Sequence, residues 1–511
     1  MTSLWLDSIQ PALSEGNASR TGPDRKADVV VIGAGITGLS TAVMLAEAGK
    51  SVIVLEARFP GAVATGNSTA KISLLQGSRL SSLARHHPAG LVKAYVDSNR
   101  DGRDWLVAFC RSNGVPIDTR TAYTYAATPN DRASVDREVA IGRAAGLDVR
   151  RVDDVSLPFD TFGAAALDGQ FEVDPARLVR ALVERLTTLG GRLVIGTATG
   201  VHAAPICTIE STVGPLRAAY VVDATGTPFL DRGLYFAKVK PQRSYALSFR
   251  MGAAALIDDG MYLSAESGQA PTRSLRTATV AGERYLIVGG NGHEVGRHPS
   301  PRVLVDDIVS WTRLHFPGSE LTHSWSAQDY ESHNLVPFVG KLPRGRGHIY
   351  FATGFAKWGM TNGPAAALRM SAEILGDTSG LPWVKVIGRR ITTPADLARG
   401  AVEGATVARE TLGGWVDAEK HPLDASSAPA EGVGIVGNIG RKPVALSTVD
   451  GVVCAVSAIC PHLGGVVTWN DAERSWDCPL HGSRFSSDGT RLEGPATRGL
   501  ARAARPDEVS G

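Results

Sequence analysis

The chain has 511 residues, a hydrophobic fraction of 43%, a charged fraction of 20% and a formal net charge of +2 at pH 7. This length predicts two or three compact units, and the composition is that of globular domains. The small net charge, without a long basic or acidic run, argues against binding to nucleic acid or to an anionic membrane surface and leaves small-molecule chemistry as the expectation.

The first 26 residues are predicted to form an N-terminal arm. The opening segment, MTSLWLDSIQPALSEGN, has neither a basic region followed by an apolar run nor a small-residue cleavage site. We therefore predict no signal peptide or twin-arginine leader. No apolar run reaches the roughly 18 residues that a membrane span needs, so we expect no span and a cytoplasmic location. The chain has only five Cys, which argues against a disulfide framework.

Residues 28–56 have the pattern of a strand, a glycine turn, a helix and a second strand. Gly33 permits the tight turn, Gly35 lets the backbone approach a diphosphate, and Gly38 allows close packing of helix and strand. The amino end of the helix would supply amide donors for phosphate, and Glu56 could accept hydrogen bonds from a ribose diol. Because the whole context is present, we predict a dinucleotide site rather than a structural turn.

Further elements follow along the chain. Asp174 precedes Pro175 and a helical pattern, and residues 192–195 and 219–222 are predicted strands. Residues 243–290 and 320–352 alternate in the manner of antiparallel strands.

The composition changes after a helical stretch at about residues 394–412. A polar segment rich in Pro, Ala and Ser follows, and we predict a linker at residues 414–425. Beyond it, two β-rich runs flank Asp450 and Gly451, a dipeptide that favours a two-residue hairpin turn. Residues 426–511 are therefore predicted to form a small β domain.

Several segments after Glu56 indicate which dinucleotide is bound. A loop rich in Gly, Ser and Thr, ARFPGAVATGNSTAK, follows it, and the chain returns twice to an apolar strand ending in Ala-Thr-Gly, at residues 220–226 and 349–354. On these segments, residues 27–413 resemble the D-amino-acid oxidase-like superfamily of FAD-dependent enzymes. The resemblance implies an α/β FAD-binding domain, similar to D-amino-acid oxidase and glutathione reductase, with an antiparallel substrate sheet.

The resemblance also implies which residues hold FAD. In the late segment ATGFAKWGMTN, a helix would begin facing the isoalloxazine, where its amino end could stabilise negative charge. No Cys lies between residues 208 and 453, so we expect FAD to be bound noncovalently. The implied cofactor-binding residues are Gly33, Gly35, Gly38, Glu56, Ala57, Arg58, Thr65, Asn67, Ser68, Thr69, Gly226, Gly354, Lys357, Gly359, Met360 and Thr361.

Two short loops near the carboxyl end each contain one Cys and one His. They are Cys460-Pro-His462 and Cys478-Pro-Leu-His481. Two Cys and two His could bind zinc, but zinc fingers usually group Cys with Cys and His with His. One Cys and one His from each loop can instead give one iron both thiolates and the other both imidazoles, which is Rieske [2Fe-2S] ligation. Residues 426–511 resemble the Rieske family, which implies an all-β Rieske domain with these four metal ligands.

The loops differ from those of respiratory Rieske domains, which carry an additional Cys in each loop and join the two by a disulfide. The corresponding positions here are Gly465 and Leu480, so that bridge cannot form. The resemblance implies that the Ser483 hydroxyl bonds to a cluster sulfur, whereas Phe485 stands where the respiratory type has a Tyr hydroxyl.

The two halves together predict an FAD-dependent oxidoreductase that oxidises a small amine, amino acid or alcohol by hydride transfer to the flavin. Electrons would then pass singly through the cluster to an external acceptor, either a protein or a quinone. For the substrate, Arg243 and Tyr245 are candidates for binding a carboxylate, and His333 and Lys357 for taking a proton. Each of the four also has a structural interpretation.

Two other functions stay open. The flavin could react directly with O2 while the Rieske domain is structural, or the protein could be an electron carrier or redox sensor without a substrate. A Rieske oxygenase is disfavoured because no D-x-x-H-x-x-x-x-H run is present, and a flavin hydroxylase because DATGTPFLD lacks the usual Asp-Gly motif.

The missing hydroxyl at Phe485 gives a first prediction. Donors to the cluster sulfurs raise the potential within the Rieske range of about −150 to +300 mV, so we expect an intermediate or low midpoint here. A redox titration of the isolated domain, followed by EPR, measures it. A midpoint above about +250 mV would contradict this interpretation.

Overall fold

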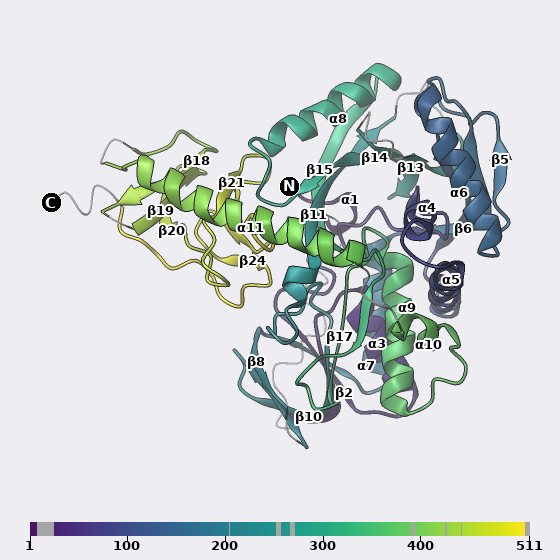
Figure 1. Cartoon of the computed structure of the whole chain (residues 1–511), viewed down its shortest axis with the longest axis horizontal. Coiled ribbons are helices and arrows are strands. Elements are labelled where there is room, and N and C mark those ends of the chain that lie inside the picture. Colours follow the sequence, from purple (N-terminus) through teal and green to yellow (C-terminus); the bar gives the residue numbers. More distant parts are fainter. Residues whose placement is uncertain are drawn as a thin grey trace.

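The computed structural model describes residues 1–7, 25–203, 205–251, 257–265, 271–389, 394–424, 427–440 and 442–505. Figure 1 shows a larger part that contains two sheets and a smaller C-terminal part, with one long helix running between them.

The first sheet carries the predicted dinucleotide fold. Within the described residues it has eight strands: β16 (Phe338–Lys341), β17 (Ile349–Thr353), β10 (Leu216–Asp223), β1 (Lys26–Ile32), β2 (Val52–Glu56) and β7 (Arg192–Ile195) in that order, with β9 (Cys207–Ser211) on β10 and β8 (Ala198–His202) on β9. Strands β17, β10, β1, β2 and β7 are parallel. The predicted strand, turn, helix and strand of residues 28–56 are therefore confirmed, and so are the strands at 192–195 and 219–222.

Helices pack on this sheet and on the second sheet described below. They are α3 (Ile36–Glu47), α4 (Arg79–Ala84), α5 (Ala89–Ser112), α6 (Arg132–Ala144), α7 (Pro175–Thr188), α8 (Pro301–His315), α9 (Gly359–Leu375) and α10 (Trp383–Gly388), with short 3-10 turns η1 (Pro129–Asp131) and η2 (Tyr235–Lys238). Asp174 caps α7 as predicted, because its carboxylate accepts from the backbone N–H groups of Ala176 and Arg177. Helices α3, α7 and α9 share one core with β1 and β2.

The second sheet is largely antiparallel, as the substrate-sheet prediction required. Its nine described strands are β15 (Glu320–Ser332), β11 (Val239–Arg250), β14 (Glu283–Glu294), β13 (Arg273–Val280), β12 (Gly260–Ser264), β4 (Ile117–Tyr125), β6 (Ala164–Val173) and β3 (Lys71–Ile72) in that order, with β5 (Arg150–Val152) on β6. One part of the prediction is wrong: β16 and β17 belong to the first sheet, where β17 pairs antiparallel with β16 but parallel with β10. An apolar strand buried on both faces has no strict alternation that could distinguish the two kinds of sheet.

The C-terminal domain contains two small antiparallel sheets. One is formed by β18 (Gly434–Ile439), β19 (Lys442–Val449) and β20 (Val452–Ser457), the other by β21 (Thr468–Asn470), β22 (Ser475–Asp477), β23 (Arg484–Ser486) and β24 (Arg491–Glu493). Asp450 and Gly451 join β19 to β20 with φ angles of +54° and +75°, which confirms the predicted hairpin.

Helix α11 (Pro394–Lys420) connects the two parts (Figure 1). The predicted linker at residues 414–425 is therefore helical up to Lys420. The helix continues through Gly413 and Gly414. No helix in the described part of the chain is both long and apolar enough to cross a membrane.

The described part of the N-terminal arm is anchored in the core. Helix α1 (Leu4–Asp7) buries Trp5, whose indole N–H donates to the Ser68 carbonyl oxygen at 2.9 Å. The Ser3 hydroxyl donates to the Gly66 carbonyl oxygen at 2.8 Å. The Arg276 guanidinium lies 5.3 Å from the centre of the Trp5 ring. The arm thus holds residues 66–68, which belong to the Ser- and Thr-rich loop predicted to contact FAD.

This anchoring gives a second prediction. Replacing Trp5 by Ala should lower the free energy of unfolding by about 3–5 kcal/mol, because a fully buried indole is lost. Urea unfolding measures the change. The matched control is Leu314→Ala, since Leu314 is 73% exposed on α8, and its effect should stay within about 0.5 kcal/mol. Equal stability of the two variants would mean that the arm does not pack in solution.

Candidate functional site

The glycine loop lies at the carboxyl end of β1, where close contacts leave no room for larger residues. Gly33 has a φ of +104°, and a Cβ there would stand 2.6 Å from the Ala224 carbonyl oxygen. A Cβ on Gly38 would stand 2.0 Å from the Gly33 carbonyl oxygen. Gly35 precedes α3 and provides no side-chain cap. The N–H groups of the first turn of α3, other than that of Ile36, are therefore available to an anion.

Glu56 supports this loop from the end of β2. Its carboxylate accepts from the backbone N–H of Ala34 at 2.7 Å and of Arg58 at 2.9 Å. Burial raises the pKa of Glu56, and these two N–H groups act in the opposite direction. The Thr65 hydroxyl accepts from the backbone N–H of Ile36 at 3.0 Å, which ties the Ser- and Thr-rich loop to the start of α3.

A cavity of about 960 Å³ extends from this loop to the substrate sheet. Most of the predicted cofactor residues line it: Gly33, Gly35, Glu56, Ala57, Arg58, Thr65, Asn67, Ser68, Thr69, Gly226, Gly354, Lys357, Gly359 and Met360. Gly38 packs behind the loop instead. Thr361 also lies outside the wall, so a direct contact with FAD is not supported, because its buried hydroxyl donates to Asn99 at 2.6 Å.

The wall fits FAD in its chemistry. At one end stand the uncapped start of α3 and the loop glycines, whose positions a Cβ would fill, and these suit a diphosphate. At the other end, the cavity reaches Ser244 and Tyr245 of β11 and the segment from Gly354 to Met360. Ser244 Oγ and Asp329 Oδ2 are buried and have no hydrogen-bond partner within the described residues, as expected of groups that meet a ligand.

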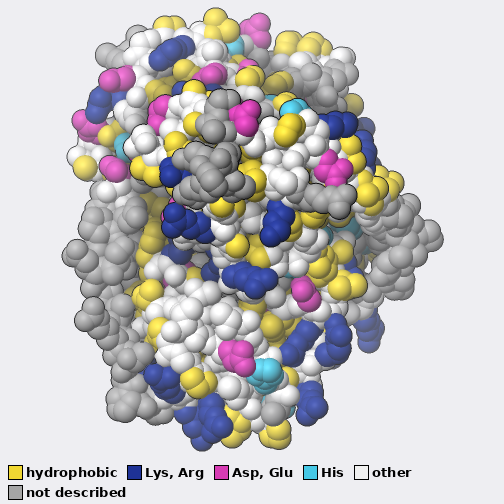
Figure 2. All heavy atoms as spheres, turned by 90° about the vertical axis from the view of Figure 1, so that its left-hand side faces the viewer, with side chains coloured by type: hydrophobic (Ala, Val, Ile, Leu, Met, Phe, Trp, Pro, Cys, Tyr) yellow, Lys and Arg dark blue, Asp and Glu magenta, His cyan; other side chains and the backbone are white. Residues whose placement is uncertain are grey.

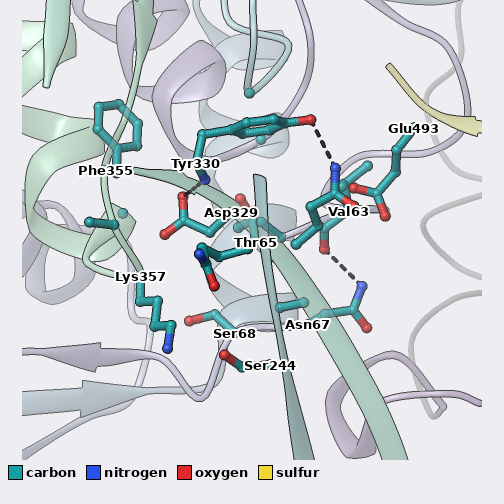
Figure 3. A pocket seen from close by; sticks show the side chains of 18 of the residues that line it. Val63, Thr65, Asn67, Ser68, Ser244, Asp329, Tyr330, Phe355, Lys357 and Glu493 are labelled. Atoms are coloured by element: carbon teal, nitrogen blue, oxygen red, sulfur yellow. Dashed lines mark hydrogen bonds between the residues drawn. The ribbon is translucent and has the colours of Figure 1, made fainter. Parts of the chain in front are cut away.

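The four candidate substrate residues divide into two pairs. Tyr245 and Lys357 line the cavity, and Figure 3 shows the Lys357 side chain extending toward Ser244. A Cβ on Gly292 would stand 2.7 Å from Lys357 Nζ and 3.1 Å from Ser244 Oγ, so the two side chains approach the same glycine. Arg243 and His333 do not line the cavity. His333 instead lies beside α11, with its Nδ1 3.6 Å from a Cβ built on Gly400.

Arg243 requires a correction, because its guanidinium points into the C-terminal domain. It pairs with Glu473 at 2.7 Å and Glu493 at 3.2 Å, and it donates to Gln328 at 2.9 Å and to Ser326. Both terminal nitrogens are thus occupied, and only the buried Nε–H has no partner among the described residues. Because Arg243 does not line the cavity, it is not placed to bind a substrate carboxylate there. Alternation along β11 places Arg243 on the opposite face from Ser244.

Arg484 completes this buried network from within the C-terminal domain. It pairs with Glu473 at 2.6 Å, Glu493 at 2.7 Å and Asp477 at 3.1 Å. Arg243 is 1% exposed and Arg484 is 6% exposed, so each needs the carboxylates around it. We call Arg243, Arg484, Glu473, Glu493 and Asp477 the interdomain ion network.

Sequence reasoning missed two titratable groups in the cavity. Lys71 of β3 donates from Nζ to Ser274 and, at 3.2 Å, to Thr69. Burial lowers the pKa of the Lys71 ammonium to about 7, with Arg276 adding to the effect. Burial raises the pKa of Asp329 to about 7, with Lys357 acting in the opposite direction. Lys71 ends the Ser- and Thr-rich loop and Asp329 lies in β15, and no local pattern indicated that they face one cavity.

The C-terminal domain also contributes to the cavity wall. Its lining residues are Arg491, Leu492, Glu493, Gly494 and Thr497. Tyr330 of β15 lies next to them, and its hydroxyl donates to the Gly494 carbonyl oxygen at 3.4 Å. Gln328 donates to the Tyr330 hydroxyl at 2.9 Å and to the Gly482 carbonyl oxygen at 2.7 Å. The cavity is thereby connected to a loop that carries predicted metal ligands.

The two predicted metal-binding loops have the same backbone conformation. In the first, Cys460 N–H donates to the Gly465 oxygen at 2.8 Å and Gly464 N–H to the Cys460 oxygen at 3.0 Å. In the second, Cys478 N–H donates to the Ser483 oxygen at 2.8 Å and Gly482 N–H to the Cys478 oxygen at 3.1 Å. Gly464 and Gly482 have φ angles of +76° and +78°. This repetition brings the two loops together as a matched pair.

The four predicted ligands lie as a thiol pair and an imidazole pair. Cys460 and Cys478 are buried and free, and their thiols are in hydrogen-bonding contact. The rings of His462 and His481 have centroids 5.1 Å apart at an angle of 87°. No three His, Cys, Asp or Glu side chains of the described chain converge on one point as ligands of a single ion. The donor set, two thiols beside two imidazoles, suits a [2Fe-2S] cluster with two ligands per iron.

The surroundings of these loops agree with the comparison to respiratory Rieske domains made from the sequence. A Cβ on Gly465 would stand 2.5 Å from Leu480, so the two positions that carry the disulfide in respiratory domains are in contact here. The Ser483 hydroxyl oxygen is fully buried and accepts from the Ala496 N–H at 3.0 Å. Its own proton therefore stays available to donate toward the cluster site.

The imidazole pair faces the larger part of the molecule. The Phe236 ring of η2 packs edge-on against His462 and His481, with centroids 4.9 and 4.8 Å away. Asp231 Oδ1 lies 3.3 Å from His462 Nε2. The side chain of His462 is therefore only 7% exposed, and His481 is 7% exposed as well.

Comparisons with known proteins agree with both parts of the chain. Residues 28–373 match the DAO family, described as FAD dependent oxidoreductase, and residues 421–504 match the Rieske [2Fe-2S] domain. The chain is 27% identical to the Rieske 2Fe-2S iron-sulfur protein YhfW of Bacillus subtilis (strain 168) over 507 residues. The aligned region covers 98% of this chain and 96% of that protein. The cytochrome b6-f complex iron-sulfur subunit of Prochlorococcus marinus is 36% identical over 109 residues, 20% of this chain and 59% of that subunit.

Solved structures share the fold of the larger part. Glycine oxidase from Geobacillus kaustophilus superimposes with a TM-score of 0.58 at 16% identity, over 72% of this chain and 99% of that one. L-proline dehydrogenase from P. horikoshii superimposes with a TM-score of 0.56 at 17% identity, over 71% of this chain and 96% of that one.

The interdomain ion network gives a third prediction. Arg243→Gln should lower the free energy of unfolding by about 3–5 kcal/mol, because Glu473 and Glu493 lose a buried partner. The control is Arg250→Gln on the same strand, since the Arg250 side chain is 48% exposed and pairs only with exposed carboxylates. It should cost less than about 1 kcal/mol. Guanidinium chloride unfolding measures both, and equal effects would show that the network does not hold the domains together.

Proposed function

The chain belongs to the family of FAD dependent oxidoreductases and ends in a Rieske domain, and from this premise we propose that it oxidises a small amine, amino acid or alcohol and delivers the electrons one at a time to an external acceptor. The observation that carries the proposal is the shared cavity. Residues 491–494 and 497 of the Rieske domain line the same space as the glycine loop and Lys357.

The predicted cofactor residues on the cavity wall would hold FAD, and Cys460, His462, Cys478 and His481 would ligate the cluster. When bound, FAD accepts two electrons from a substrate as a hydride, whereas a Rieske cluster carries one electron at a time. Two hydrogen bonds join the two sites: Gln328 donates to the Tyr330 hydroxyl on the cavity side and to the Gly482 carbonyl oxygen on the cluster side.

The substrate end of the cavity favours a ligand with an amine and an anionic group. Lys71 and Lys357 supply ammonium groups that could attract a carboxylate. Asp329, with a pKa raised to about 7, could take the proton from a substrate ammonium, because a base with a pKa near the working pH is efficient. The solved structures of similar fold are named for glycine and L-proline, which also favours an amine or amino acid here.

The electron exit would lie on the exposed side of the Rieske domain. Phe236 and Asp231 cover the imidazole pair, so an acceptor is kept away from that edge. Leu463, next to His462, is 51% exposed. Figure 2 shows the face of the molecule that carries this domain, on which Asp and Glu as well as Lys and Arg side chains are exposed.

A fourth prediction tests the order of electron flow. Mixing the protein with amines, amino acids or alcohols without oxygen in a stopped-flow instrument should bleach the flavin first and reduce the cluster afterwards. A cluster that never changes its redox state with any reducing substrate would contradict the proposal and leave a structural Rieske domain.

The matched variants are Cys460→Ser and Cys454→Ser. The first removes a proposed ligand and should abolish reduction of a one-electron acceptor while flavin reduction keeps its rate. The second changes a half-buried thiol in β20 of the same domain and should leave both rates unchanged. Equal loss of both activities in Cys460→Ser, with FAD content intact, would contradict the assigned order.

A further inference from the structure

Arg491 is a cation of the Rieske domain that faces the predicted FAD site. It begins β24, lines the cavity and is half-buried. Its guanidinium donates weakly, at 3.4 Å, to the Ala496 carbonyl oxygen. None of the carboxylates that the structure describes lies within ion-pairing distance of Arg491. Arg243 and Arg484, by contrast, each pair with Glu473. Most of its five donors are therefore available to a ligand.

The charges around Arg491 show which end of the cavity it faces. Burial lowers its pKa, Glu56 opposes that effect and Arg58 adds to it. Glu56 ends β2 and Arg58 follows it, beside the glycine loop and the start of α3. Glu56 already accepts two backbone N–H groups and does not bind the guanidinium directly. Two guanidinium groups and the start of α3 thus lie at this end of the cavity, beside the Glu56 carboxylate.

We propose that Arg491 binds the diphosphate of FAD, so that the Rieske domain completes the dinucleotide site of the larger domain. A planar guanidinium binds two phosphate oxygens at once, and the partly buried position strengthens that bond relative to one in water. The glycine loop and the start of α3 would hold the diphosphate from one side and Arg491 from the other. The inference rests on the FAD site of the proposed function, but not on its substrate or its electron path.

One consequence is that cofactor loading and domain docking are coupled. Glu493, two residues after Arg491 in β24, pairs with Arg243 of the larger domain. A ligand that binds Arg491 therefore holds the same strand that the interdomain ion network holds. Because coupling of two binding events is reciprocal, FAD would tighten docking of the Rieske domain, and a docked domain would retain FAD.

The test compares three variants: Arg491→Gln, Arg491→Lys and the control Arg498→Gln. Arg498 belongs to the same C-terminal segment but is exposed and does not line the cavity. Flavin-free protein is titrated with FAD, and quenching of flavin fluorescence gives the dissociation constant. Iron and sulfide content, with the EPR spectrum of the reduced cluster, shows that the Rieske domain is intact in each variant.

We expect Arg491→Gln to raise the FAD dissociation constant about 10- to 100-fold, Arg491→Lys to raise it less, and Arg498→Gln to leave it unchanged. ADP and adenosine, used as competitors, locate the contact. Arg491→Gln should weaken competition by ADP, which carries a diphosphate, and leave competition by adenosine as it is.

An unchanged FAD dissociation constant in Arg491→Gln, with the cluster intact, would overturn the proposal. Equal weakening of ADP and adenosine would also overturn it, because the contact would then not be to phosphate. If Arg491→Gln loses its cluster, Arg491→Lys decides by the same measurements. None of these titrations uses a substrate or an electron acceptor, so a failed oxidation assay and a failed Arg491 prediction are distinguishable.

Discussion

A buried ion network between the two domains is the constraint on which the rest of the arrangement depends. Arg243 of the substrate sheet and Arg484 of the Rieske domain share Glu473 and Glu493 between them. Removed from water, each of these charges is costly unless its partners stand in position, so the network permits one orientation of the domains far more readily than others. Glu493 belongs to the strand that also carries Arg491, and the network therefore positions part of the cavity wall as well as the domain itself.

This docking brings a predicted two-electron site and a predicted one-electron site into contact. The segment from Arg491 to Thr497 lines the cavity on one side, while Ala496 donates to Ser483 beside the cysteines on the other. Gly482 makes the close approach possible, because a Cβ there would stand 2.6 Å from Pro241 of β11. The imidazoles are covered by Phe236, so this edge of the predicted cluster site faces the larger domain, and the two thiols are buried within the Rieske domain.

Features encoded over short distances were predictable. The glycine loop, the acid at the end of the next strand, the Asp450-Gly451 hairpin and the paired Cys/His loops each depend on residues a few positions apart. Their backbone geometry follows from steric and hydrogen-bonding rules that act locally, so their spacing predicts their form. The strand at residues 349–353 shows the limit of this reasoning, because an apolar run does not indicate which sheet receives it.

By itself, then, the sequence determined two cofactor motifs, the class of each domain and most residues around the glycine loop. Only the tertiary structure decided what Arg243 and Arg491 face. Arg243 meets Glu473 and Glu493 across separations of 230 and 250 residues, and no local pattern specifies contacts of that range. Arg243, a predicted substrate residue, does not line the cavity, whereas Arg491, for which no prediction was made, does. The physical reason is that docking, not spacing, sets which charges are buried together.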